Sequence, residues 1–527
     1  MWLNANSKEL QWFLESAQVY WEKNLPRPAD DAVILVEAFH QDIRVNLRNL
    51  AFANAIRRLH PARMVVLTGV EEQWQRTLWS GFDIGKVRDV SQAFAASEVI
   101  DVWDRVRKMT EPGAPDQLLL DYTDATYCRL AKVPSLPEGY RDRADYRLRH
   151  AYATRLFKLY QGLFEPGNVV ALVTSHVDYD QWGLAVESAR RAGVPIIHTQ
   201  QTGCLKAYGL FPENDTGTET FRGELTRQIG DVFETQVWPR REELKPIAEL
   251  VAWRAKVNLG RPSWWRGGVT ASVDLNNPAE RARLRSHVVD RLGFDPDRPV
   301  VTVFNHAVSD ALGTNRELFP SLADWFSDTA AYAAEHPEAQ WLFLDHPSQA
   351  LYDSTGFFDS VAAKYKKVKH LAFRPSATLS KNALWSLTDL GVTVRGSVSN
   401  ELPAYGIPVI QAGWSEWSSC GLSTVVDDQD AYWKTLEQSI TAIRDGADLV
   451  TEEQVRRARL WLWLYRSGTD VVTPLVPQWE VWPADVLLKT MRATFRHIEA
   501  DSDPLFTAVE RMWTRKEPML TRTDFRT

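Results

Sequence analysis

The stretch GVTVRGSVSNELPAYGIPVIQAG, residues 391 to 413, decides the fold predicted for this chain. A short apolar run, residues 392 to 394, ends in a turn of small residues, a brief helix follows, and Gly406 opens a second apolar run. Short buried strands that alternate with helices are typical of a parallel α/β sheet. The stretch therefore predicts one strand, turn, helix, strand unit of such a sheet.

The turn between this strand and its helix has the features of a phosphate site. Gly396 lets the backbone approach a ligand, and Ser397 or Ser399 can cap the helix. Exposed N–H groups at a helix N-terminus favour an anion, and Arg395 adds a fork of donors. We expect a ligand here; the alternative is a capped helix beside an arginine that pairs with a carboxylate.

A second stretch, residues 168 to 199, repeats the pattern. The strand 169 to 173 runs into the polar turn 174 to 179 and a helix, and AGVPII at 192 to 197 echoes YGIPVI at 405 to 410. A repeated unit indicates two similar domains rather than one continuous sheet. The predicted fold class is α/β, with two Rossmann-like domains and a helical, Trp-rich C-terminal tail.

The rest of the chain fits this architecture. We expect helices over residues 5 to 24, 43 to 59, 97 to 108, 146 to 160, 318 to 335, 430 to 445, 455 to 465 and 484 to 500. We expect further strands over residues 33 to 36, 64 to 67, 300 to 304 and 341 to 344. The predicted organisation is an N-terminal helix (1 to 29), an acceptor domain (30 to 245), a linker (246 to 295), a nucleotide-sugar domain (296 to 448) and a tail (449 to 527).

Composition narrows the function classes. The 527 residues, 44% of them hydrophobic, suit a soluble globular protein of several domain-sized units. A net charge of -7, from 61 basic and 68 acidic residues, gives no basic footprint, so nucleic acid is not expected as a partner. Three dispersed cysteines favour a reducing cytoplasm. The start lacks a signal-peptide pattern, and no apolar run approaches the ~20 residues of a spanning helix.

The 22 tryptophans are the unusual feature of the composition. A Trp ring suits sugars, membrane interfaces and protein contacts, although core packing is its commonest use. The run LWLWLY, residues 460 to 465, lies beside Arg456, Arg457 and Arg459. It is either a helix packed into an interdomain seam or a peripheral contact with the inner face of the cell membrane.

The ordered motifs resemble those of GT-B glycosyltransferases of the bacterial capsule and surface-polysaccharide type. In the C-terminal half, the residues that carry the resemblance follow predicted strands: Asn305, His306, Asp310, the pair His346-Pro347, and Gly396, Ser397 and Glu401 before the run 406 to 410. In the N-terminal half, they are Asp121, Tyr122, Tyr127 and Arg129, followed by His176 and Tyr179.

This resemblance implies a cleft in which the C-terminal domain holds a sugar nucleotide and the N-terminal domain holds the acceptor. Glu401 would accept hydrogen bonds from ribose hydroxyls, and His346 would hold a phosphate oxygen. The His-Pro pair resembles that of transferases using CMP-sugars, including sialyl- and Kdo-transferases, and also occurs in teichoic-acid-type polymerases. Two residues depart from the pattern, Asp345 before the histidine and Pro403 in the short helix.

The implied binding residues form two sets. The donor set is His346, Pro347, Arg395, Gly396, Ser397, Ser399, Glu401, Asn305, His306 and Asp310. The acceptor set is Tyr122, Tyr127, Arg129 and Tyr179.

The catalytic base is left among several candidates. An inverting transferase needs a carboxylate or histidine within reach of the acceptor hydroxyl, whereas a retaining one needs a group on the opposite face of the sugar. The candidates at the ligand edge of the N-terminal domain are His40, Asp42, Asp121, Asp124, His176 and Asp178. No His, Cys and Asp cluster has metal-ligand spacing, so metal-independent catalysis without a cofactor is expected. The missing G-x-S-x-G motif argues against a hydrolase.

The sequence therefore predicts a cytoplasmic glycosyltransferase. It would move a sugar from a nucleotide-sugar, with a CMP-sugar such as CMP-Kdo favoured over a UDP-sugar, to a surface or capsular glycan. The alternatives are a nucleotide-sugar epimerase of the same fold and a non-catalytic glycan-binding or scaffold protein.

Overall fold

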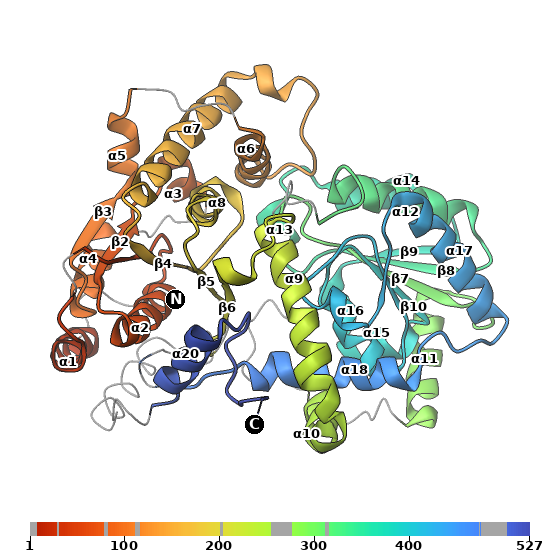
Figure 1. Ribbon diagram of the computed structural model, residues 1–527. Helices are drawn as coiled ribbons and strands as arrows, with labels where there is room; N and C mark the ends of the chain where they lie inside the picture. Colours follow the sequence, from red (N-terminus) through yellow and green to blue (C-terminus); the bar gives the residue numbers. More distant parts are fainter. Residues whose placement is uncertain are drawn as a thin grey trace.

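A computed structural model describes residues 8–28, 31–77, 83–110, 116–200, 204–254, 277–310, 316–473, 475 and 503–526. Its two six-stranded sheets lie side by side, one in each half of the chain (Figure 1). The first sheet contains β1 (Val33–Glu37), β2 (Arg63–Thr68), β3 (Glu98–Asp101), β4 (Val169–Thr174), β5 (Ile196–Thr199) and β6 (Ala207–Leu210). The second contains β7 (Val300–Phe304), β8 (Gln340–Leu344), β9 (Leu371–Arg374), β10 (Leu390–Thr393), β11 (Val409–Gln411) and β12 (Thr424–Val425).

Both sheets have the same topology. The first has the order β3-β2-β1-β4-β5-β6, and the second, read in the same direction, has β9-β8-β7-β10-β11-β12. This is the 3-2-1-4-5-6 order of a Rossmann fold, and it places a topological switch point between β1 and β4 and another between β7 and β10. Among the described strands of the two sheets, all pairings are parallel except that of β5 with β6. The predicted fold class, α/β with two Rossmann-like domains, is confirmed.

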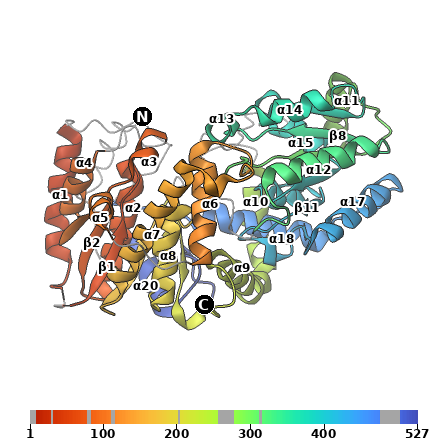
Figure 2. The ribbon, with the colours of Figure 1, turned by 90° about the horizontal axis from the view of Figure 1, so that it is seen from above.

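Helices cover the faces of the sheets (Figures 1 and 2). The helices of the N-terminal half are α1 (Lys8–Asn24), α2 (Ile43–Leu59), α3 (Glu72–Thr77), α4 (Ile84–Ala93), α5 (Val102–Lys108), α6 (Gln117–Ala131), α7 (Ala144–Phe164), α8 (Leu184–Arg191), α9 (Phe221–Val232) and α10 (Arg241–Arg254). Those of the C-terminal half are α11 (Pro278–Leu292), α12 (Leu322–Glu335), α13 (Gln349–Tyr352), α14 (Phe357–Lys364), α15 (Lys381–Leu387), α16 (Val398–Glu401), α17 (Gln429–Arg444), α18 (Glu452–Trp463) and α20 (Pro504–Arg515).

The central strands are buried along their whole length, which explains their composition. Every residue of β1 (VILVE), β7 (VVTVF) and β8 (QWLFL) is buried. Parallel strands covered by helices on both faces need continuous apolar runs rather than alternation. Such runs are visible in the sequence, so these strands were predicted to within one residue.

The echoed motifs occupy equivalent places. Gly193 and Gly406 both have a left-handed backbone, with φ of 65° and 75°. Glycine adopts this conformation without steric cost, so each ends a helical segment and turns the chain into a strand. That strand is β5 in one domain and β11 in the other, the fifth strand of each sheet.

One predicted helix was wrong at its start. Residues 97 to 108 were expected to be helical throughout, but Glu98–Asp101 forms β3 at the sheet edge and pairs in parallel with β2. The β-branched Val99 and Ile100 favour this strand. Asp101 then caps α5, because its carboxylate accepts a hydrogen bond from the backbone N–H of Asp104 at 2.9 Å.

The C-terminal segments connect the two domains. Leu460, Trp461, Leu462 and Trp463 of α18 are buried in a core that also contains residues of both sheets' domains. Farther on, α20 packs against α2 of the N-terminal domain. The LWLWLY run therefore packs in the interdomain seam. The predicted helix 484 to 500 lies outside the described residues, and the predicted linker 246 to 295 contains α11, which packs on α15.

Candidate functional site

A cavity of ≈ 250 Å³ lies between the two domains at the carboxyl ends of their strands. This is the edge at which open α/β sheets bind ligands. Its lining comes from both halves of the chain: His176, Asp178, His198, Gln200, Arg222, His306, Asp310, Arg316, Arg395, Ser415 and Glu416. Five of these residues were among the predicted donor-site residues or base candidates. We call this space the interdomain cavity.

The switch points of the two sheets both contribute to it. His176 follows β4 in the N-terminal domain, while His306 follows β7 and Arg395 follows β10 in the C-terminal domain. Loops that leave adjacent strands in opposite directions open a crevice at such a point. The cavity is thus the place where the crevices of the two domains meet.

Asp178 is clamped by two arginines. Its Oδ1 and Oδ2 accept hydrogen bonds from Arg222 at 2.9 Å and 2.5 Å, and the guanidinium of Arg316 lies 3.6 Å away. Burial alone would raise the pKa of this carboxyl, but Arg222 and Arg316 hold it well below its usual range. A carboxylate so stabilised is a weak base.

His176 is oriented as a hydrogen-bond donor. Its Nδ1 accepts from the backbone N–H groups of Val177 and Asp178, each at 3.1 Å. Burial lowers the pKa of His176, so the ring is neutral and carries its proton on Nε2. In this tautomer the ring can donate from Nε2 to an anionic ligand. Its other nitrogen, Nδ1, is already occupied by the two backbone hydrogen bonds and is not available to accept a proton.

Tyr179 joins the domains. Its hydroxyl donates a hydrogen bond of 2.8 Å to Oδ1 of Asp310 in the C-terminal domain. Its backbone has φ of 64°, a conformation that is costly for an aromatic residue and that recurs at functional sites. Asp310 lines the cavity, and within the described residues it forms no ion pair.

The C-terminal wall offers several nitrogen donors. Arg395 pairs with Glu317, donates to the backbone carbonyl of Asp310 at 2.6 Å and points Nε toward Nε2 of His306 at 3.5 Å. The His306 ring stacks on that of His346, with centroids 5.8 Å apart. Nδ1 of His306 and Nδ2 of Asn305 are buried without a hydrogen-bond partner in the described part of the chain.

His346 lies just behind this wall. Its Nδ1 accepts from the backbone N–H of Ser348 at 3.2 Å, so a neutral ring would carry a proton on Nε2. Asp345 accepts a backbone hydrogen bond from Ser376 at 2.5 Å, which gives this departure from the family pattern a structural task. Pro347 follows directly in the same loop.

The turn after β10, residues 395 to 399, has an exposed tip and a buried base. Ser397 is exposed and its side chain makes no capping bond, while Gly396 packs against Thr393. Ser399 is buried, donating to the carbonyl of Gly396 at 2.8 Å and accepting from Trp417 at 2.9 Å. The phosphate-binding role of this turn stays a prediction.

Glu401 takes part in a buried ion-pair triad. One carboxylate oxygen contacts Lys381 and the other contacts Arg466 of the tail. Pro403, the second departure, begins a separate helical turn and therefore breaks no helix. The ribose-binding role predicted for Glu401 stays a prediction, and two cations already hold its oxygens.

Several predicted acceptor-domain residues lie away from the cavity lining. Asp121 accepts from Gln117 at 2.9 Å, and Tyr127 donates to Asp145 at 3.0 Å. Asp124 accepts from Tyr140 and Tyr146. These contacts build the corner between α6 and α7.

Three others lie nearer to the domain interface or the sheet edge. Arg129 donates to the carbonyl of Leu351 at 2.8 Å and stacks on a tyrosine of α13, so it joins the domains. Tyr122 packs so closely on Gly183 that a Cβ there would stand 2.1 Å from its ring. His40 accepts at Nδ1 from the backbone N–H of Asp42 at 2.9 Å.

Sequence reasoning missed half of the cavity lining. His198 is the penultimate residue of β5, so the rule that located His176 at the carboxyl end of a strand could also have found it. Arg222 on α9 and Arg316 before α12 carry no such signal, since each is one of many arginines in polar segments. The remaining residues missed are Gln200, Ser415 and Glu416.

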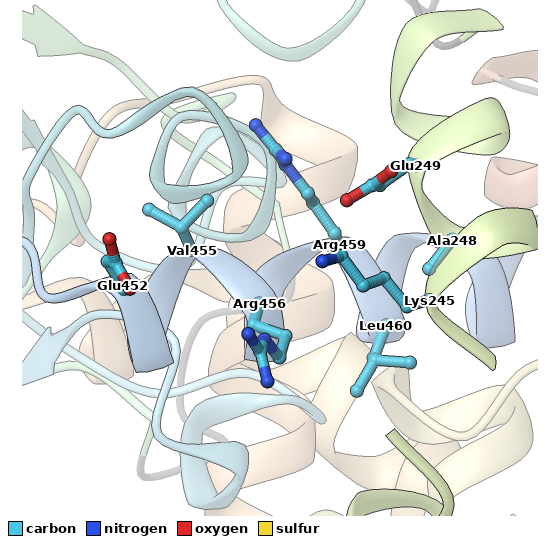
Figure 3. A pocket seen from close by; sticks show the side chains of 8 residues that line it. All are labelled: Lys245, Ala248, Glu249, Glu452, Val455, Arg456, Arg459 and Leu460. Atoms are coloured by element: carbon cyan, nitrogen blue, oxygen red, sulfur yellow. The ribbon is translucent and has the colours of Figure 1, made fainter. Parts of the chain in front are cut away.

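A second hollow, of ≈ 290 Å³, lies between α10 and α18 (Figure 3). Arg456 there pairs with Glu242, and Arg459 donates to the carbonyl of Ala404 at 3.0 Å. These contacts join the helices of the seam, and none of the predicted site residues lines this hollow.

The described residues show neither a metal-binding cluster nor a membrane-spanning helix. They contain no group of three or more His, Cys, Asp and Glu side chains placed to hold a metal ion. No helix among them combines the length and apolar character needed to cross a membrane.

Comparison with known proteins gives weak, distant similarities. No family model and no curated protein matches the chain. Among solved structures, it is similar to a glycosyltransferase from Rickettsia africae, at 9% identity and TM-score 0.29 over 90% of this chain and 100% of that one. It is also similar to KpsC, a beta Kdo 2,4 transferase from Thermosulfurimonas dismutans, at 12% identity and TM-score 0.30 over 56% and 80%. A third is a UDP-GlcNAc 2-epimerase from Neisseria meningitidis bound to UDP-GlcNAc, at 9% identity and TM-score 0.23 over 82% and 100%.

Proposed function

We propose that this protein is a glycosyltransferase that uses a nucleotide-sugar donor. The observation that carries the proposal is the interdomain cavity at the two switch points, where Arg222, Arg316 and Arg395 stand beside neutral histidines. Guanidinium groups and N–H donors held in a buried cleft suit a nucleotide leaving group, because they stabilise the charge that develops on its phosphate as the sugar is transferred.

A CMP-sugar is the favoured donor and a UDP-sugar the alternative, with a surface or capsular glycan as acceptor. His306 lines the C-terminal wall and His346 stacks behind it, and the resemblance to CMP-sugar transferases supports a donor phosphate on this side of the cavity. Nε2–H of His346 would donate to the phosphate. The buried, unpaired donor of Asn305 fits a further oxygen of the nucleotide.

Asp310 is the carboxylate best suited to acid–base chemistry in this proposal. Asp178 is neutralised by two arginines and Glu416 by one, whereas Asp310 is held by the neutral hydroxyl of Tyr179. Although burial would raise it, the pKa of Asp310 is lowered by His306 and Arg395, so the carboxylate is ionised at neutral pH. Its selection as the base therefore rests on its place in the cavity and on its forming no ion pair among the described residues, and not on its pKa. The residue thus moves from the predicted donor-binding set to the proposed base.

Calorimetric titration tests the function. CMP, UDP and GDP are titrated into the full chain, and we expect one of them to bind and Arg395→Ala to weaken that binding at least about tenfold. Arg298→Ala, at the opposite end of β7, is the matched control and should bind as the wild type does. Absence of binding by all three nucleotides would refute the proposal.

Product analysis separates the proposal from the epimerase alternative. A transferase needs an acceptor to consume its donor productively, whereas an epimerase changes the sugar of the free nucleotide donor. Incubation of the binding nucleotide's sugar derivatives without acceptor should leave the sugar configuration unchanged. An epimerised nucleotide-sugar would favour the alternative.

A further inference from the structure

The formal charges of the interdomain cavity cancel. Among the described residues that line it, the three arginines are matched by three carboxylates, those of Asp178, Asp310 and Glu416. The histidines add no charge, since burial lowers the pKa of His176, His198 and His306. A cavity that looks basic from its arginines is therefore close to neutral.

Each arginine already has a carboxylate partner. Arg222 contacts both Asp178 and Glu416, Arg316 lies 3.6 Å from Asp178, and Arg395 pairs with Glu317. Burial, followed by repulsion from Arg395 and Arg222, lowers the pKa of Arg316 to about 10, which shows how crowded these cations are. The carboxylates are what makes this crowding tolerable.

Glu416 differs from Asp178 in its position and in its exposure to the cavity. It stands in the loop after β11, and its Oε1 accepts from Nη1 of Arg222, across the domain interface, at 3.0 Å. Its side chain is 18% exposed, so it faces the cavity, whereas the side chain of Asp178 is only 6% exposed. Asp178 binds Arg222 through both oxygens but is shared with Arg316, so Glu416 supplies the negative charge that balances the lining while its side chain still faces the cavity.

We propose that Glu416 makes the cavity select nucleotides with one phosphate over those with two. This inference rests on the proposed function and specifies the donor class of the same site. A nucleoside diphosphate brings one more negative charge than the monophosphate, and a carboxylate in a cavity of low dielectric repels it strongly. Specificity of this kind comes from a group that penalises the wrong ligand.

The test compares CMP and CDP by calorimetry on the full chain, at about pH 7.5 and low salt, where screening is weak. We expect the wild type to bind CDP no more tightly than CMP. Glu416→Gln replaces the carboxylate by an amide whose oxygen can still accept the hydrogen bond from Arg222, but it removes the negative charge. It should tighten CDP binding about tenfold and CMP binding clearly less, because tenfold corresponds to the loss of one nearby like charge.

Two further variants complete the design. Glu416→Asp keeps the charge and should keep the wild-type ratio of CDP to CMP affinity. Glu437→Gln, an exposed position on α17, changes net charge equally and should leave both affinities unchanged. Thermal unfolding of each variant checks that the domains still pack.

The outcomes separate this inference from the proposed function. If the wild type binds CMP but Glu416→Gln leaves the CDP to CMP ratio unchanged, the inference is overturned and the proposed function stands. A wild type that prefers CDP tenfold or more also overturns it. If the protein binds no nucleotide at all, both proposals fail together.

Discussion

The turns after β4 and β10 occupy the same topological place in their two domains, yet they differ in chemistry beyond the one buried charge that each brings to the cavity. The turn after β4 presents charged and aromatic groups, Asp178 and Tyr179, that are buried and contact Arg316 and Asp310 across the domain interface. The turn after β10 begins with the buried Arg395, which lines the cavity, and continues with small residues that have the exposed Ser397 at their tip. The fold supplies the position at the sheet edge, and the side chains decide whether that position joins domains or stays open to a ligand.

Asp178→Ala should have the largest effect on stability, because it removes the buried charge of the turn after β4. Arg222 and Arg316 would lose a buried partner, and the expected loss in free energy of unfolding is about 3 kcal/mol. Denaturant unfolding followed by tryptophan fluorescence measures it. A loss below about 1 kcal/mol would show that Glu416 alone can satisfy Arg222.

Asp310→Asn should abolish most of the turnover while leaving the structure intact. General base catalysis contributes at least about a hundredfold to rate, and the amide keeps the acceptor oxygen for Tyr179. Single-turnover kinetics with the donor identified by calorimetry gives the effect, and nucleotide affinity serves as the control. Turnover within about threefold of the wild type would exclude Asp310 as the base.

Acid should destabilise the cavity through its histidines. Burial lowers the pKa of His176, His198 and His306 below the ordinary 6.5, so below about pH 6.5 the unfolded chain binds more protons than the folded one. Stability is therefore fully present above pH 6.5 and is lost as pH falls toward the folded pKa values. Unfolding at a series of pH values tests the sign, and His198→Asn should flatten the dependence.

Tyr179→Phe should destabilise the turn after β4 by a smaller amount. The ring and its packing remain, but the hydrogen bond to the Asp310 carboxylate is lost, at a cost of about 1.5 kcal/mol. If Asp310 is the base, the acidic limb of the rate profile should also move to higher pH, because a donor that stabilises the ionised carboxylate is gone. An unchanged profile would reduce Tyr179 to a structural role.

Ser397→Ala, at the tip of the turn after β10, should have the smallest effect on stability. The side chain is exposed and caps nothing, so the free energy of unfolding should change by less than about 0.5 kcal/mol. Nucleotide affinity should nevertheless fall if the phosphate-site prediction for this turn is right. Unchanged affinity would confine ligand binding to the arginines and histidines of the cavity.

Local pattern was enough to predict most of the fold. Buried strands such as β1 and β7 are continuous β-branched runs, and the paired Gly-x-Pro motifs before β5 and β11 revealed the repeat of the domain. The edge strand β3 was missed because a short strand next to a helix has no periodicity of its own, and pairing with β2 decided it.

By itself the sequence determined the two α/β domains and the residues that follow their strands, His176, His306 and Arg395 among them, because strand ends are encoded by neighbouring residues. Only the tertiary structure decided which charges meet. Arg222 lies 44 positions from Asp178 and 194 from Glu416, and it contacts both. Such pairs depend on the path of the whole chain and on burial that makes each charge need a partner. That is why the near-neutral cavity, and the role proposed for Glu416 in it, emerged only from the assembled domains.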